Sequence, residues 1–161
     1  MASKATTEIV QDGIEDLLLQ HLGDIAKVDV LPTDFNLEAI VEHTAERTDK
    51  YPHLFVFTPL TDQEFASSSN RMAKDLITVN VYVGVRNKKQ RELHVQRVEA
   101  EQLCLYVRAA LQGERVQGDY TNNAIIEGFS MDQEFNAEGF ALYNTEFIVP
   151  IKIDLDDVQL P

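Results

Sequence analysis

Apolar side chains recur every three or four residues near the start of the chain, which is the spacing of one face of an α-helix. The pattern predicts a helix over residues 7–22, with Thr7 as its N-terminal cap and Gly23 as its end. A shorter pattern of the same kind predicts a helix over 36–47, and the longest one predicts a helix over 91–112. The apolar face of the first helix consists of Val10, Ile14, Leu17, Leu18 and Leu22.

Strict alternation of apolar and polar residues predicts β-strands elsewhere in the chain. The clearest case is 76–86, in which four valines fall on one side. Further strands are predicted over 26–31, 53–59, 124–134 and 140–153.

Three features modify these strands. Gly128 predicts a β-bulge in its strand, and Pro150 places its strand, or the far half of it, at a sheet edge. Residues 60–73 are polar and rich in serine, which predicts a long hairpin loop or a flexible arm.

The predicted order is helix, strand, short helix, two strands, long helix and two strands. Antiparallel hairpins with helices on one side indicate an α+β fold, with a twisted, mainly antiparallel sheet and the helices packed on one face. We expect a single domain over 1–161, with a flexible loop at about 60–73 and an acidic end at 154–161.

Composition and charge exclude several classes of protein. The chain has 161 residues, and 14 basic against 27 acidic residues give a net charge of −13. Such an acidic balance argues against a broad binding surface for nucleic acid or for an anionic membrane. The single cysteine excludes an intrachain disulfide and a cysteine-based zinc site. With no signal peptide or long apolar run, we expect a soluble protein made in the cytoplasm.

Few residues suggest chemistry. The glycines never cluster as a phosphate-binding loop does, and Ser67, Ser68 and Ser69 lack the context of a nucleophilic serine. Cys104 falls on the apolar face of the long helix, which favours core packing over catalysis. The histidines lie too far apart for a metal site and are expected at surface or half-buried positions: His21, His43, His53 and His94. We therefore expect no catalytic residue, no metal and no cofactor.

Carboxylate pairs offer the best enzymatic alternative. Asp132 and Glu134 share a strand face, and metal-dependent nucleases use carboxylate pairs of this kind. In a chain so rich in acids, however, a solvated face is the default interpretation. The aspartates at 154, 156 and 157 lack the glycine turn of a calcium loop.

The charges are unevenly distributed along the chain. Four of the 14 basic residues lie within six positions, whereas residues 116–161 hold nine acids and one lysine. This polarity suggests head-to-tail assembly, in which the basic turn of one copy meets the acidic end of the next. The predicted interface consists of Arg86, Lys88, Lys89, Arg91, Asp154, Asp156 and Asp157. A solvated loop is the plainer explanation, and phosphate binding by the basic turn is a third.

The element order and several stretches resemble the phage tail terminator or tail completion proteins, including the Mu-like group of contractile-tailed phages. The resemblance covers about residues 7–153. It is carried by EIVQDGIEDLLLQHL, PHLFVFTP, LITVNVYVGVRN, RELHVQRVEAEQL and NTEFIVPIKID.

The resemblance implies a non-enzymatic virion protein that forms a ring, typically of six copies, at the head-proximal end of the tail. Such a ring ends polymerisation of the tail tube and offers a docking surface to the neck. The implied partners are further copies of the chain, the tail tube protein and neck or connector proteins, with the sheath as a further candidate. An acidic lumen would let DNA pass without adhering.

The polar loop is our candidate for the tube-contacting or neck-contacting arm, through Gln63, Glu64, Phe65, Asn70 and Arg71. Other functions stay open at this stage. A neck stopper or connector subunit is the alternative among structural proteins. A metal-dependent hydrolase and an acidic binding module that mimics DNA are alternatives of other classes.

Overall fold

The computed structural model describes residues 2–31, 38, 52–59, 63–69, 71–85, 93–137 and 140–161. In chain order the elements are α1 (Thr6–Leu22), β1 (Lys27–Val30), β2 (His53–Phe57), β3 (Glu64–Ser69), β4 (Met72–Val85), α3 (Leu93–Leu111), β5 (Arg115–Val116), β6 (Ala124–Ile125), β7 (Glu127–Ala137), β8 (Phe140–Asp154) and the 3₁₀ turn η2 (Leu155–Asp157). The helix expected over 36–47 lies outside the described residues, apart from Glu38. None of the described helices is both long and apolar enough to cross a bilayer.

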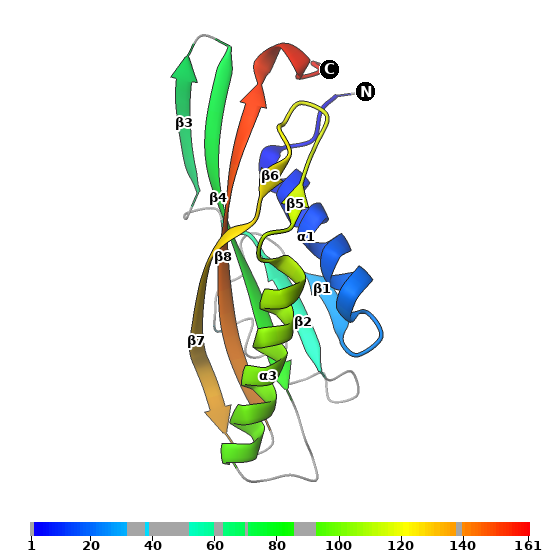
Figure 1. Ribbon diagram of the computed structural model, residues 1–161, viewed down its shortest axis with the longest axis vertical. Helices are drawn as coiled ribbons and strands as arrows, with labels where there is room; N and C mark the ends of the chain where they lie inside the picture. The colour runs from blue at the N-terminus through cyan, green and yellow to red at the C-terminus, as the bar shows by residue number, and fades with distance from the viewer. Residues whose placement is uncertain are drawn as a thin grey trace.

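Six strands form one mixed sheet. Five of them follow the order β1-β2-β4-β8-β7, and β3 pairs with β4 beside this path. The β1–β2 pair is parallel, and the other pairs are antiparallel. Both helices lie on the same side of the sheet, and β5 and β6 form a small separate ribbon next to α1 (Figure 1). The expected α+β fold is confirmed.

The long strands β4 and β8 join two parts of the molecule. They pair without a break from Met72 with Asp154 to Val85 with Ala141. In the main part, β2 and β7 flank them, and the helices cover one face. Beyond Ile77, β3 replaces β2 beside β4, and β7 has ended. We call this second part, made of β3, 72–76 of β4, 150–154 of β8 and η2, the extension; it projects at one end of the molecule (Figure 1).

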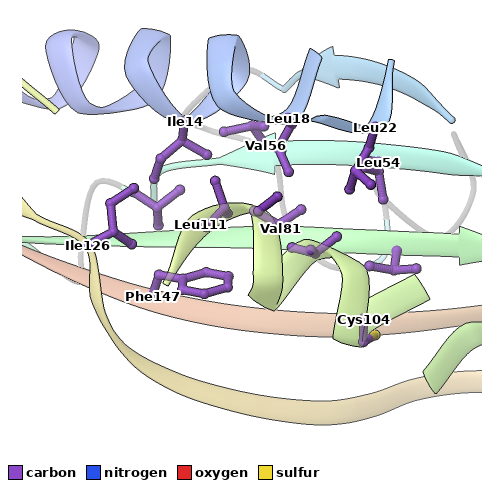
Figure 2. Packing of buried hydrophobic residues seen from close by; sticks show 14 of the residues in the cluster. Ile14, Leu18, Leu22, Leu54, Val56, Val81, Cys104, Leu111, Ile126 and Phe147 are labelled. Carbon is purple, nitrogen blue, oxygen red and sulfur yellow. The ribbon is translucent and has the colours of Figure 1, made fainter. Parts of the chain in front are cut away.

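The core fills the space between the helices and the main part of the sheet. Figure 2 shows side chains of α1, such as Ile14 and Leu18, directed toward Val56 of β2, with Leu111 of α3 close to Val81 and Phe147. These residues are fully buried. The opposite face buries a second cluster, consisting of Leu31, Phe55, Phe57, Tyr82, Phe140 and Leu142. Because both faces of the central strands are buried, apolar side chains lie on both sides of them, together with a few buried polar ones such as Asn80 and Thr145.

The predicted cap of the first helix is wrong by two positions. The helix begins at Thr6 after an extended Ala5, and no side chain caps its first turn. The Thr6 hydroxyl instead lies 3.2 Å from the Tyr120 hydroxyl, so the contact with a distant loop fixes this end. The predicted end is correct, because the Gly23 N–H donates to the Leu19 carbonyl.

The loop predicted over 60–73 also needs correction. Residues Glu64–Ser69 form β3, and β4 begins at Met72, so most of the segment is a β-hairpin. Serine has little intrinsic preference for a strand, but the exposed edge of β4 offers backbone partners that override this preference.

Two predictions about β7 and β8 can be compared with the pairing. Gly128 has a φ of 67° at a register shift between Glu127 and Phe129, which confirms the bulge. Pro150 lies in the half of β8 that β7 no longer pairs, because that pairing ends at Ile148. This half is therefore bordered by the 120–122 loop instead of a full strand.

Candidate functional site

Two sets of residues that the sequence predicts as separate contact sites meet at the tip of the extension. Arg71, in the turn of the β3–β4 hairpin, donates from Nε to Oδ1 of Asp156 at 2.9 Å. Its Nη2 donates to the Leu155 carbonyl at 3.3 Å, and the Leu155 N–H donates to the Arg71 carbonyl at 2.9 Å. The hairpin turn and η2 therefore form one joined surface, although they lie far apart in the sequence.

The acidic residues at this tip have different surroundings. Asp154 caps η2, since its Oδ1 accepts a hydrogen bond of 3.0 Å from the Asp156 N–H. Asp156 is paired with Arg71 in an exposed ion pair. Asp157 is exposed. Two of the three aspartates predicted to meet a neighbouring copy therefore already have bonds within the chain.

Gln63, predicted to contact the tube or the neck, instead makes hydrogen bonds within the chain. Its side-chain amide fills the gap between β2 and β3 along the edge of β4. Oε1 accepts from the Thr78 N–H at 2.9 Å, and Nε2 donates to the Thr78 carbonyl at 3.1 Å and to the Pro59 carbonyl at 2.7 Å. The amide thus replaces a strand residue at the point where the extension begins, which explains why Gln63 is half-buried.

Apolar side chains are exposed around the same end. Phe65 of β3 has 65% of its surface exposed, the largest fraction for any described aromatic residue. Met72 and Leu155 are also partly exposed. Of the other predicted contact residues, Glu64 is the first residue of β3, and Asn70 lies outside the described residues.

The basic cluster of Arg86, Lys88, Lys89 and Arg91 lies outside the described residues, so its predicted role is untested. The elements that flank it are placed, however. The end of β4 and the start of α3 lie at the end of the molecule opposite to η2 (Figure 1).

Asp75 is a residue that the sequence analysis missed. It lies on the same side of β4 as the core residues Ile77 and Val79, and its register partners are Phe65 of β3 and Ile151 of β8. Only 6% of Asp75 is exposed, and no hydrogen bond or ion pair joins its carboxylate to another residue in the described part of the chain. Burial raises its pKa above the ordinary aspartate value. An acidic residue at an inward position of an alternating strand was the signal that could have revealed it.

Both carboxylates of the pair proposed for a hydrolase belong to β7. Asp132 and Glu134 lie two residues apart on β7, and burial raises the pKa of Glu134, with the Asp132 carboxylate as a second cause. Within the described parts of the chain, no three histidine, cysteine, aspartate or glutamate side chains converge to hold an ion.

Cys104 and His53 belong to the interior. Cys104 is fully buried, and burial, helped by Glu101, raises the pKa of its thiol to about 12, so the expected core role is confirmed. His53 corrects the expectation of surface or half-buried histidines, because it is fully buried, stacks on Phe55, and lies 2.6 Å from Oδ2 of Asp29. His21 is exposed, and His43 lies outside the described residues.

Comparison with known proteins gives one informative result. No protein-family model and no curated protein sequence matches the chain. A solved chain from "Virion of native gene transfer agent (GTA) particle" superposes with a TM-score of 0.57 at 15% sequence identity, covering 93% of this chain and 99% of that chain. A second solved chain, at 14% identity over 88% of this chain and 94% of its own, reaches only 0.43 and carries no argument. The first likeness shows a shared fold along nearly the whole of both chains.

Proposed function

We propose that this chain is a non-enzymatic structural protein of a phage-like virion, and more specifically a tail terminator that caps the head-proximal end of the tail as a ring. The observation that carries the proposal is the end-to-end likeness of fold to a chain of a gene transfer agent virion. A match that covers both chains almost completely concerns the whole domain and not a common substructure.

The geometry is consistent with a steric and interfacial role. The described surface offers a projecting extension with exposed apolar side chains. Mechanistically, copies would associate side by side into a ring, and the ring would cover the last layer of the tube so that no further subunit can add. Its other face would then accept the neck. The net charge of −13 suits a lumen through which DNA slides.

The proposal is tested by adding the purified protein to polymerising tail tubes and measuring tube length by electron microscopy. We expect a ring at one end of each tube and a limit on growth. The native mass, measured by light scattering, should approach six times 18.2 kDa at low salt.

Two results would contradict the proposal. Tubes of unchanged length with bare ends would exclude a terminator. Binding to isolated heads or connectors but not to tubes would instead favour the neck stopper or connector subunit.

A further inference from the structure

We propose that Phe65 and Asp75 form a receptor site on the extension for the basic segment 86–91 of a second copy of this chain. The inference rests on the proposed ring and specifies the contact that builds it. It begins from Asp75, of which only 6% is exposed and whose carboxylate has no hydrogen-bond or ion-pair partner among the residues that the structure describes.

A buried carboxylate without a partner is costly, and native proteins retain one where something else compensates it. The register partners of Asp75 are Phe65 of β3 on one side and the fully buried Ile151 of β8 on the other, and burial disfavours the charged form of its carboxyl group. The isolated chain therefore carries an unfavourable charge that a bound cation would neutralise.

The chemistry of the two side chains specifies the ligand. A carboxylate attracts a cation by charge, and the face of an aromatic ring attracts a cation through its quadrupole. Lysine and arginine side chains satisfy both groups at once. The chain already uses such a contact elsewhere, since the Arg108 guanidinium lies 4.4 Å above the Phe129 ring.

A second copy of this chain is the occupant that the charge distribution favours. The segment 86–91 holds four of the 14 basic residues of an otherwise acidic chain. It follows Val85, which is ten residues beyond Asp75 on β4, or about 33 Å away in an extended strand. Asp75 and Val85, the residue that precedes the basic segment, thus lie far apart on one strand. The proposed contact therefore joins different copies head to tail, and such a contact closes into a ring when the rotation allows.

This assignment revises two earlier predictions. It places Phe65 between copies of the chain and not against the tube. It also moves the main acidic partner from Asp154 and Asp156, which are engaged in the η2 cap and with Arg71, to Asp75.

The test uses two full-length variants whose defects are complementary. Asp75→Asn removes the receptor charge with little change of shape, and Lys88→Glu/Lys89→Glu reverses the charge of the basic segment. Each variant alone should remain a single chain at concentrations at which the wild type assembles, because losing one partner of a desolvated charge pair weakens binding about thirtyfold or more. Mixed together, they retain one intact contact, so light scattering should show a species of twice 18.2 kDa that grows no further.

Two further variants accompany the test, and three outcomes would overturn the inference. Asp132→Asn, at an exposed position on β7, should assemble as the wild type does. Phe65→Ser should weaken assembly less than Asp75→Asn, because the charge remains. Assembly of Asp75→Asn into the full ring would overturn the inference while the ring itself stands, and a mixture that stays as single chains would also overturn it. A wild type that never associates in solution would overturn it too, whereas the tail-tube experiment would still decide the proposed function.

Discussion

The two parts of the sheet share the same pair of long strands but bury their side chains differently. In the main part, β4 and β8 have a neighbouring strand on each side, and apolar clusters lie on both faces. In the extension, β3 and a short loop flank the same strands, Phe65 is mostly exposed, and an acid occupies an inward position. The main part therefore holds most of the buried apolar side chains, whereas the extension keeps an exposed aromatic ring and a carboxylate without a partner among the described residues.

The largest loss of stability should come from a substitution in the core of the main part. Phe147→Ala removes a fully buried ring that packs against Phe129 with ring centroids 5.6 Å apart. Truncating a buried phenylalanine costs about 3–5 kcal/mol, a large share of the stability of a domain. Urea denaturation should therefore show unfolding of the whole chain, the extension included. Phe65→Ala, at the exposed ring of the extension, is the matched control and should change stability by less than about 0.5 kcal/mol; equal losses would refute the comparison.

The second-largest loss of stability should come from a substitution at Gln63, and it should affect the extension but not the main part. Gln63→Ala leaves the N–H and carbonyl of Thr78 without their side-chain partners. We expect a loss of about 2 kcal/mol, with amide hydrogen exchange accelerated in β3 and unchanged in α1. The exposed Gln117→Ala serves as control. Uniform acceleration throughout the sheet would mean that the extension does not open independently of the main part.

Asp75→Asn should stabilise the isolated chain. The substitution removes a poorly solvated charge that has no partner among the described residues, so the unfolding free energy should rise by about 1 kcal/mol and the melting temperature by about 2–4 °C. Because the raised pKa of Asp75 penalises the charged form in the folded state, the penalty is fully present at neutral pH and disappears as the pH falls through that pKa. The difference between variant and wild type should therefore shrink toward acidic pH.

The measurement is thermal denaturation at a protein concentration at which the chain is unassembled, from neutral to acidic pH. Asp132→Asn should leave the melting temperature unchanged. A destabilised Asp75→Asn would mean that the carboxylate supports the extension, which is the opposite of a site kept for a partner.

The smallest loss of stability should come from breaking the ion pair at the tip of the extension. Arg71→Ala breaks an exposed ion pair with Asp156, which contributes about 0.5 kcal/mol or less. A double-mutant cycle with Asp156→Ala should give a coupling energy of this size that decreases with added salt. A coupling above about 2 kcal/mol would show that the tip is as rigid as the main part.

The sequence was most informative where side-chain periodicity decides the structure. The predicted 7–22 and 91–112 helices agree with α1 and α3 to within two residues, and the predicted 140–153 strand agrees with β8 to within one. In each case a continuous apolar face is buried, so the pattern along the chain carries the information.

The sequence was least informative where backbone pairing or distant contacts decide. β3 forms because the edge of β4 offers partners, and its serine-rich sequence carries no such signal. The Arg71–Asp156 pair joins residues 85 positions apart, which no local pattern can reveal. Asp75 is different, since its inward register was readable from the alternation of β4, although its lack of a partner required the structure.

The unbroken pairing of β4 with β8 has a mechanical consequence. Their hydrogen bonds run across the long axis of the molecule, so tension between the extension and the far end loads the whole row in shear and does not peel bonds one after another. A force applied at the hairpin tip would reach the opposite end with little stretching. The stiffness of the chain along its long axis therefore comes from β4 and β8, the same two strands that hold the extension apart from the opposite end of the molecule.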